Sequence, residues 1–179
     1  MDRGSQRRAF GALIHHAKET FDDCTKDTAL VAPISPSPLA LIERVLRNLD
    51  LKSDDVVMDL GCGDGRWLIA AALMAGCSCR GFDLNETLLE KARGKATESR
   101  VALLVTLECR DIFEVSLAGC TVIIIYLFRE GLARLKTKLE EEAAPGARIV
   151  SVGFRIRGWV PTSSVPEDGM KAYVYRVPE

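Results

Sequence analysis

The sequence predicts an α/β protein built on a doubly wound, mostly parallel β-sheet with helices on both faces. Three observations carry this prediction. Short apolar runs alternate with helical segments along most of the chain. A glycine-rich turn separates the first apolar run from the helix behind it, as in nucleotide-binding folds of this kind. The last run alternates apolar and polar residues, which is typical of the antiparallel partner of an earlier strand.

The chain has room for one substantial core, since 179 residues are too few for two ordinary domains. Prolines at positions 33, 36 and 38 mark a stiff linker, because each fixes its own backbone and biases the preceding residue toward extended geometry. We therefore expect an N-terminal helical extension and proline-rich linker over residues 1–35, followed by a single ligand-binding domain over residues 36–179.

Residues 1–18 carry four basic side chains against one acidic side chain, and their apolar residues have helical spacing. This pattern fits a helix that packs against the domain or partly covers its ligand, and it also resembles a short mitochondrial transit peptide. Acidic residues at positions 19, 22 and 23 favour the packed helix. We expect a cytoplasmic protein, with a mitochondrial location as the alternative.

Composition excludes several kinds of partner. The net charge of −1 predicts no dominating electrostatic partner, so nucleic acid is not expected to bind. The longest apolar run, residues 121–128, falls well short of the roughly 18 to 20 residues that cross a bilayer, so no integral membrane segment is expected. The six cysteines have neither a secretory signal nor a metal-ligand spacing, which predicts reduced, mostly buried thiols and no metal site.

The first half of the domain contains three predicted strands and three predicted helices. Ser37 is expected to cap a helix with Pro38 at its first position and an apolar face over residues 39–49. Strands are expected over residues 56–60, 79–82 and 102–107, and helices over residues 65–75 and 86–98. Trp67 is expected in the core, because its helix is apolar all round. Asn85 is a good N-cap for the next helix, whose charged residues, Lys95 among them, are expected in solvent.

The second half continues the alternation. Residues 122–126 are apolar without interruption, which predicts a central strand buried on both faces. A helix over residues 130–143 is closed by Pro145 and Gly146, and residues 148–154 form the next predicted strand. Residues 172–177 complete the predicted antiparallel hairpin.

The turn after the first strand points to a nucleoside ligand. Gly61, Gly63 and Gly65 allow backbone amides to approach a ligand, and Asp83, at the end of the next apolar run, can hold a ribose diol. Arg66 stands where the dinucleotide fingerprint has its third glycine, and the phosphate-binding G-x-x-x-x-G-K-[ST] motif is absent. A nucleoside with an amino-acid tail is therefore favoured, its carboxylate at the positive end of the helix. S-adenosylmethionine fits this description; a nicotinamide dinucleotide and a purely structural turn are the alternatives.

The chain resembles the class I, seven-stranded S-adenosylmethionine-dependent methyltransferases from about residue 36 to residue 177, on the run Asp-Leu-Gly-Cys-Gly-Asp-Gly over residues 59–65. More narrowly it is similar to the small family that includes the mitochondrial lysine methyltransferases of ATP synthase subunit c and of the adenine nucleotide translocase. The narrower likeness is carried by residues 36–38, 59–66, 111–113, 126–127, 135–136, 138–139, 145–151 and 159–161. It implies a Rossmann-like sheet of seven strands. Eukaryotic members carry a membrane segment before the domain, and its absence here disfavours their membrane-protein substrates.

The resemblance also implies a set of cofactor-binding residues. Asp59 helps to hold the methionine amino group, and Gly61 and Gly63 let the backbone approach. Asp83, followed by Leu84, accepts both ribose hydroxyls.

Further along the chain, the resemblance places Asp111 at the adenine amino group and Ile112 beside the ring. A turn-forming acid is the structural alternative for Asp111.

Methyl transfer from a sulfonium is an in-line displacement, so the protein has mainly to align the reacting atoms and exclude water. Tyr126 lies where this fold presents residues to the methyl group and is the candidate catalytic residue, although a buried structural tyrosine fits equally well. No general base is assigned. Arg155 and Arg157 are better explained as a solvated loop than as part of a substrate groove.

The function expected from these residues is N-methylation of a protein lysine. A small-molecule methyl acceptor and a catalytically silent cofactor-binding module are the alternatives. The partner is accordingly a protein substrate or a small molecule, and the sequence does not specify an oligomeric state.

Overall fold

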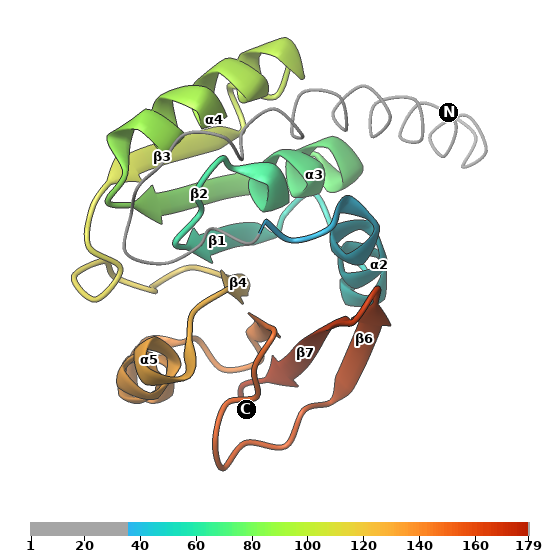
Figure 1. The fold of residues 1–179 in the computed structure, drawn as a ribbon, viewed down its shortest axis with the longest axis vertical. Coiled ribbons are helices and arrows are strands. Elements are labelled where there is room, and N and C mark those ends of the chain that lie inside the picture. The colour runs from blue at the N-terminus through green and yellow to red at the C-terminus, as the bar shows by residue number, and fades with distance from the viewer. Residues whose placement is uncertain (1–35, 179) are drawn as a thin grey trace.

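A computed structural model describes residues 36–178 of the chain (Figure 1). The extension predicted over residues 1–35 lies outside the described residues. None of the helices in the described part of the chain combines the length and the apolarity that crossing a membrane requires.

The described residues form one sheet of seven strands in the order β3-β2-β1-β4-β5-β7-β6. The strands are β1 Val56–Leu60, β2 Ser78–Asp83, β3 Val105–Cys109, β4 Val122–Ile125, β5 Arg148–Val152, β6 Ser163–Glu167 and β7 Met170–Arg176. The first five are parallel to one another, and β7 runs antiparallel to both β5 and β6. The strand order reverses between β1 and β4, and ligands of such sheets bind at the carboxyl ends of the strands beside this switch point.

Helices cover both faces of the sheet, as predicted. They are α2 Leu39–Leu49, α3 Arg66–Ala75, α4 Glu86–Glu98 and α5 Arg129–Glu142. Figure 1 shows α5 apart from the other three helices, and the core divides accordingly. In β4, Val122 and Ile124 pack into the core cluster of α2 and α3, whereas Ile123 and Ile125 pack into the cluster of α5. The predicted burial of β4 on both faces is confirmed.

The predicted cap of α2 is wrong. The helix begins at Leu39 with Pro38 at the N-cap position, and no side chain caps it. The Ser37 hydroxyl instead accepts a hydrogen bond of 3.1 Å from Nε1 of Trp67, which is buried as predicted. A buried indole N–H needs a hydrogen-bond acceptor. The Ser37 hydroxyl fills this role for Trp67 and does not cap the helix.

The third predicted strand is displaced toward the C-terminus. Residues 102–104 form a turn, in which the amide of Leu104 donates to the carbonyl of Val101 at 2.9 Å, and Leu103 is fully exposed. Strand β3 therefore begins only at Val105. Apolar letters alone do not separate such a turn from a buried strand.

Strand β6 was not predicted, although a local signal for it exists. Asp168 and Gly169 have φ values of 44° and 78° and join β6 to β7 as a two-residue hairpin turn. Aspartate followed by glycine is a strong hairpin signal. Pro166 obscures the strand in the sequence, and it is tolerated because β6 is at the edge of the sheet.

Candidate functional site

The glycine turn after β1 is fastened to β2 through the backbone. The amides of Gly61 and Cys62 both donate to the carbonyl of Phe82, at 2.9 and 3.0 Å. Gly61 and Gly63 have φ values of 89° and 51°, a conformation that strains any residue with a Cβ atom. A Cβ atom placed on Gly63 would meet no atom of the described residues within 4 Å. The turn therefore presents open backbone that a ligand can approach.

The carboxylate of Asp83 lies against this turn at the end of β2. Its Oδ2 accepts a hydrogen bond of 2.8 Å from the amide of Gly63, and its Oδ1 accepts one of 2.9 Å from the amide of Asn85. Each oxygen keeps acceptor capacity, because a carboxylate oxygen has two lone pairs. Asp83 is thus held in one orientation beside the glycine turn, and the next residue, Leu84, is exposed.

Asp59 is a buried acid near the end of β1, with 3% of its surface exposed. Burial and the negative charges of Asp83 and Asp64 raise the pKa of Asp59 well above its ordinary value. The causes of this shift include no hydrogen bond from residues 36–178 to the Asp59 side chain. A buried carboxylate of this kind is stabilised by a cation, which an ammonium group of a ligand supplies.

A buried ion network supports the glycine turn. The Asp64 carboxylate pairs with Arg66 at 2.8 Å and with Lys95 of α4 at 3.0 Å. Burial alone would raise the pKa of Asp64, but hydrogen bonds from Arg66 and the charges of both cations outweigh it and hold the pKa below its ordinary value. Arg66 also donates to the carbonyl of Ser37 at 3.0 Å. The network joins the turn, α4 and the segment before α2.

The network corrects one prediction. Lys95 was expected in solvent, yet only 11% of its side chain is exposed, because it reaches Asp64 across the helix layer. The sequence gives no local signal for this contact.

Asp111 follows β3 at the same edge of the sheet. The amide of Arg110, one residue earlier, donates to the carbonyl of Asp83 at 3.1 Å, which brings the two chain segments together. The Asp111 side chain accepts a hydrogen bond of 2.9 Å from the amide of Phe113, which is the arrangement of a turn-forming acid. Ile112 is half-buried and packs against the core on the α5 side.

Tyr126 comes directly after β4 and is half-buried. A Cβ atom built on Gly153, just beyond β5, would lie 3.3 Å from Cε2 of Tyr126, so the ring lies between the ends of these strands. Leu127 faces the glycine turn, since a Cβ on Gly61 would lie 3.8 Å from its Cδ2. The candidate catalytic residue is therefore close to the candidate cofactor residues.

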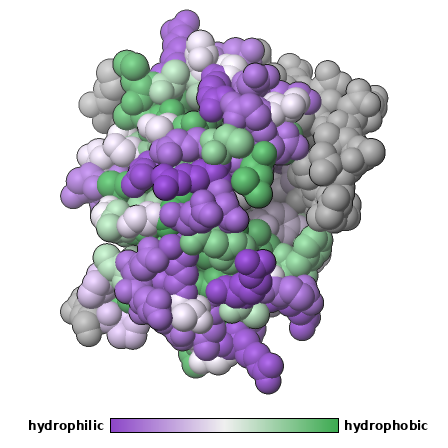
Figure 2. All heavy atoms as spheres, turned by 90° about the vertical axis from the view of Figure 1, so that its left-hand side faces the viewer, coloured by the Kyte–Doolittle hydropathy of each residue, from purple (hydrophilic) through white to green (hydrophobic). Residues whose placement is uncertain are grey.

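All the predicted site residues thus come from the carboxyl ends of strands β1 to β4 or the turns that follow them. The arrows of β1 and β2 point to the left in Figure 1. Figure 2 looks onto that side, where hydrophobic residues show between hydrophilic ones near the middle of the face. The fold assembles at one edge a set of residues dispersed over residues 59–126.

This strand order, with a glycine turn after β1 and an acid at the end of β2, defines a class I S-adenosylmethionine-dependent methyltransferase. Within that class, a model of the ANTKMT methyltransferase domain matches residues 59–163, and the chain belongs to this family. The resemblance seen in the sequence is confirmed.

Several relatives carry names that describe lysine methylation. The chain is 35% identical to a protein-lysine N-methyltransferase of Saccharolobus islandicus, over 76% of this chain and 86% of that protein. It is 33% identical to the adenine nucleotide translocase lysine N-methyltransferase of Mus musculus, over 76% of this chain and 59% of the relative. Across the vertebrate relatives, the chain spans 54% to 62% of their length.

A solved structure with a similar fold is the RNA methyltransferase from Salinibacter ruber in complex with S-adenosyl-L-homocysteine. It is 35% identical, with a TM-score of 0.78 over 80% of this chain and 94% of that chain. The described residues fit S-adenosylmethionine, because they offer a buried acid with a raised pKa, an open glycine turn and a fixed carboxylate beside it.

Proposed function

We propose that this protein transfers a methyl group from S-adenosylmethionine to the side-chain amine of a lysine in a protein substrate. Two findings support the proposal. Relatives named as lysine N-methyltransferases match most of the described domain, and the Saccharolobus islandicus protein matches over most of its own length. The observation that carries the cofactor assignment is Asp59, a buried carboxylate beside an open glycine turn.

In this proposal Asp59 pairs with the ammonium group of the methionine tail. Its raised pKa reflects the cost of burying a charge beside Asp83 and Asp64, and a cation in contact with it removes that cost. Gly61 and Gly63 let the main chain approach the ligand, since neither has a side chain to stand in the way.

The nucleoside half of the cofactor is assigned to the next two strand ends. Asp83 accepts hydrogen bonds from both ribose hydroxyls with its carboxylate held by the amides of Gly63 and Asn85, and Leu84 lies beside it. Asp111 accepts from the adenine amino group, and Ile112 contacts the ring. The hydrogen bond from Phe113 leaves the second oxygen of Asp111 available for that contact.

When bound, S-adenosylmethionine supplies an electrophilic methyl group on a sulfonium sulfur. The protein has to hold a neutral lysine amine in line with it and keep water out. Tyr126 orients the amine through its hydroxyl or its ring face. A poorly solvated site that already contains a cation favours the neutral form of the amine, so no protein base is assigned.

Two measurements test the proposal. Calorimetry should register binding of S-adenosylmethionine and of S-adenosylhomocysteine, and absence of heat with both would refute the cofactor site. Incubation with methyl-labelled cofactor and a cell extract should label protein, and hydrolysis of that protein should release methylated lysine. Label found only in small molecules would remove the lysine assignment and leave the cofactor site standing.

A second candidate function is methylation of RNA, favoured by the name of the Salinibacter ruber relative. The same labelled extract decides between the two. Label that is lost on treatment with ribonuclease and retained after treatment with protease would establish RNA as the acceptor.

A further inference from the structure

A groove of about 940 Å³ lies between the N-terminal half of α5 and the loop over residues 153–158 that follows β5. It adjoins the candidate acceptor site, because Gly153 both lines the groove and packs against the ring of Tyr126. Phe128 and Phe154 meet at this junction with their ring centroids 6.5 Å apart. A chain that placed a lysine at Tyr126 would continue past these rings into the groove.

The groove is basic. Its lining includes Arg129, Lys136, Arg155 and Arg157 against one carboxylate, that of Glu130. Lys136 lies 3.4 Å from a carboxylate oxygen of Glu140, but the three arginines have no carboxylate partner within residues 36–178. In a protein with a net charge of −1, this local excess of positive charge is not a general property of the surface.

Hydrogen bonds hold the backbone of the loop that carries Arg155 and Arg157. Arg155 and Arg157 are exposed, whereas Ile156 between them is buried. The amide of Ile156 donates a hydrogen bond of 3.0 Å to the hydroxyl of Tyr175. The Ser151 hydroxyl donates a hydrogen bond of 2.6 Å to the carbonyl of Phe154. A preorganised loop loses less conformational entropy when it binds a partner.

The aromatic rings of the groove are already covered on one face by guanidinium groups. Arg129 lies 5.3 Å from the ring centre of Phe154, and Arg155 lies 5.1 Å from that of Tyr173. Single-stranded nucleic acid binds mainly by stacking bases on open aromatic faces. Arginines placed in this way are better suited to carboxylates, which they bind in a bidentate manner.

We propose that this groove binds an acidic segment of the substrate protein next to the lysine that is methylated. The inference rests on the proposed function and specifies its substrate class: lysines flanked by glutamate or aspartate. Lysine itself is repelled by the groove, so the acidic flank supplies the attraction and sets the register of the chain.

The test uses a fluorescent peptide in which a single lysine is flanked on both sides by glutamates, and a twin peptide with glutamine in their place. Binding to the full chain is followed by fluorescence anisotropy without cofactor. The double variant Arg155→Glu, Arg157→Glu should weaken binding of the acidic peptide by about tenfold or more at low ionic strength. The neutral double variant Arg155→Gln, Arg157→Gln should fall between it and the unchanged protein.

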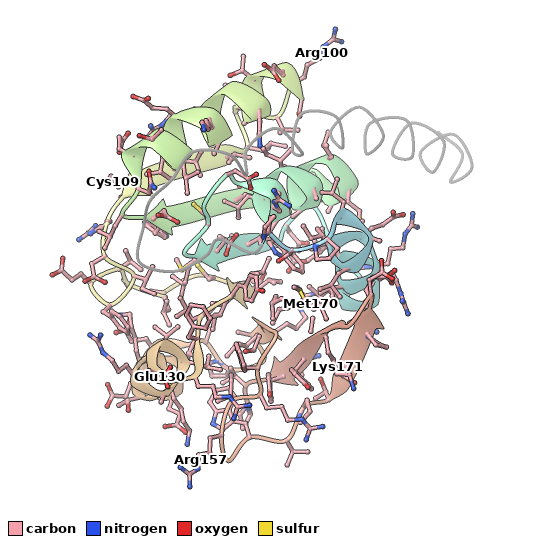
Figure 3. The ribbon with its side chains drawn as sticks, in the orientation of Figure 1. Arg100, Cys109, Glu130, Arg157, Met170 and Lys171 are labelled. Atoms are coloured by element: carbon pink, nitrogen blue, oxygen red, sulfur yellow. The ribbon has the colours of Figure 1, made fainter. Side chains whose placement is uncertain are left out.

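The matched control is Arg100→Glu, which reverses the charge of an arginine in the same way. Figure 3 shows Arg100 at the opposite end of the molecule from Arg157, and Glu130 on α5. Arg100→Glu should leave binding of the acidic peptide unchanged, and all variants should bind S-adenosylmethionine like the unchanged protein. Loss of cofactor binding in the Arg155→Glu, Arg157→Glu variant would mean that these substitutions act on the fold. The test of peptide binding then uses the Arg155→Gln, Arg157→Gln variant.

Three outcomes would overturn the inference: equal affinity for the acidic and the neutral peptide, equal loss in Arg100→Glu, or an oligouridylate that displaces the acidic peptide and binds more tightly through the same arginines. The last outcome favours RNA. Failure of the proposed function has a different signature, since peptide binding would then persist while no lysine is methylated in the presence of cofactor.

Discussion

The cofactor side of the site, around the glycine turn, and the groove beside α5 are stabilised and lined by different kinds of groups. Around the glycine turn, Asp83 is fixed by two backbone amides and Asp64 by two buried cations. Beside α5, the groove is lined by exposed arginines without carboxylate partners in the described part of the chain. The first side suits a ligand of constant shape, and the second suits a partner recognised by its charge. Substitutions should therefore act on stability and cofactor affinity on the first side, and on substrate choice on the second.

The largest effect is expected from Arg66→Ala, which removes a support of the cofactor side. Among residues 36–178 it leaves the buried carboxylate of Asp64 with Lys95 as its remaining ion-pair partner, and it should lower the free energy of unfolding by about 3 kcal/mol. Urea denaturation at neutral pH measures the loss. The exposed Arg110→Ala should change stability little, and an equal loss in both variants would contradict the assigned role of the network.

The same network predicts a dependence of stability on pH. Because the folded pKa of Asp64 lies below its ordinary value of 3.8, its contribution is present above pH 3.8 and is lost as the pH falls through the folded pKa. Stability of Arg66→Ala should fall less steeply over that acidic range than stability of the unchanged protein.

The next effect is expected from Asp83→Ala, which removes the acceptor of the ribose hydroxyls. Loss of two charge-assisted hydrogen bonds should weaken binding of S-adenosylmethionine by about 100-fold, or about 2.7 kcal/mol. Calorimetry measures the change, and Asp54→Ala at an exposed position is the matched control. Unchanged affinity in Asp83→Ala would remove this residue from the site.

A smaller effect, with opposite signs in two measurements, is expected from Asp59→Asn. Cofactor affinity should fall by about tenfold, because the anionic partner of the methionine ammonium is lost. The free protein should become more stable at neutral pH. Since the folded pKa of Asp59 is raised, the unchanged protein loses stability as the pH rises from 3.8 through that pKa, and asparagine lacks this loss.

Cofactor affinity of the unchanged protein should also decrease as the pH falls below the raised pKa of Asp59, since a protonated carboxyl does not pair with an ammonium. Calorimetric titrations at several pH values measure this trend, which should be absent in Asp59→Asn. A parallel trend in both proteins would assign the pH dependence to another group.

The smallest effect is expected from Tyr126→Phe on the acceptor side. The ring keeps its packing against Gly153, so cofactor binding should not change, while loss of the hydroxyl should lower kcat for lysine methylation by up to about tenfold. Steady-state kinetics measure the effect. An unchanged kcat would mean that the ring face, and not the hydroxyl, positions the amine.

Prediction from sequence was most successful where the cause is local. Asn85 caps α4 as expected, with its side chain accepting 3.2 Å from the amide of Leu88, because the N-cap bond spans only three residues. Ser37 was assigned a similar role and was predicted wrongly, because its hydroxyl is taken by Trp67, thirty residues away. The capping propensity of a residue type describes which hydrogen bonds its side chain is able to form. Tertiary packing decides which of these bonds forms.

By itself the sequence determined the alternation of strands and helices, the glycine turn and the placement of Asp59 and Asp83 at strand ends. These features depend on backbone conformation and on spacing along a few residues. Only the tertiary structure decided that Lys95 reaches Asp64 and that the loop after β5 faces α5 across a basic groove. The first contact joins residues 31 positions apart and is stabilised by burial and by paired charges. The second exists only once β5 has paired with β4, which places the loop after β5 beside α5.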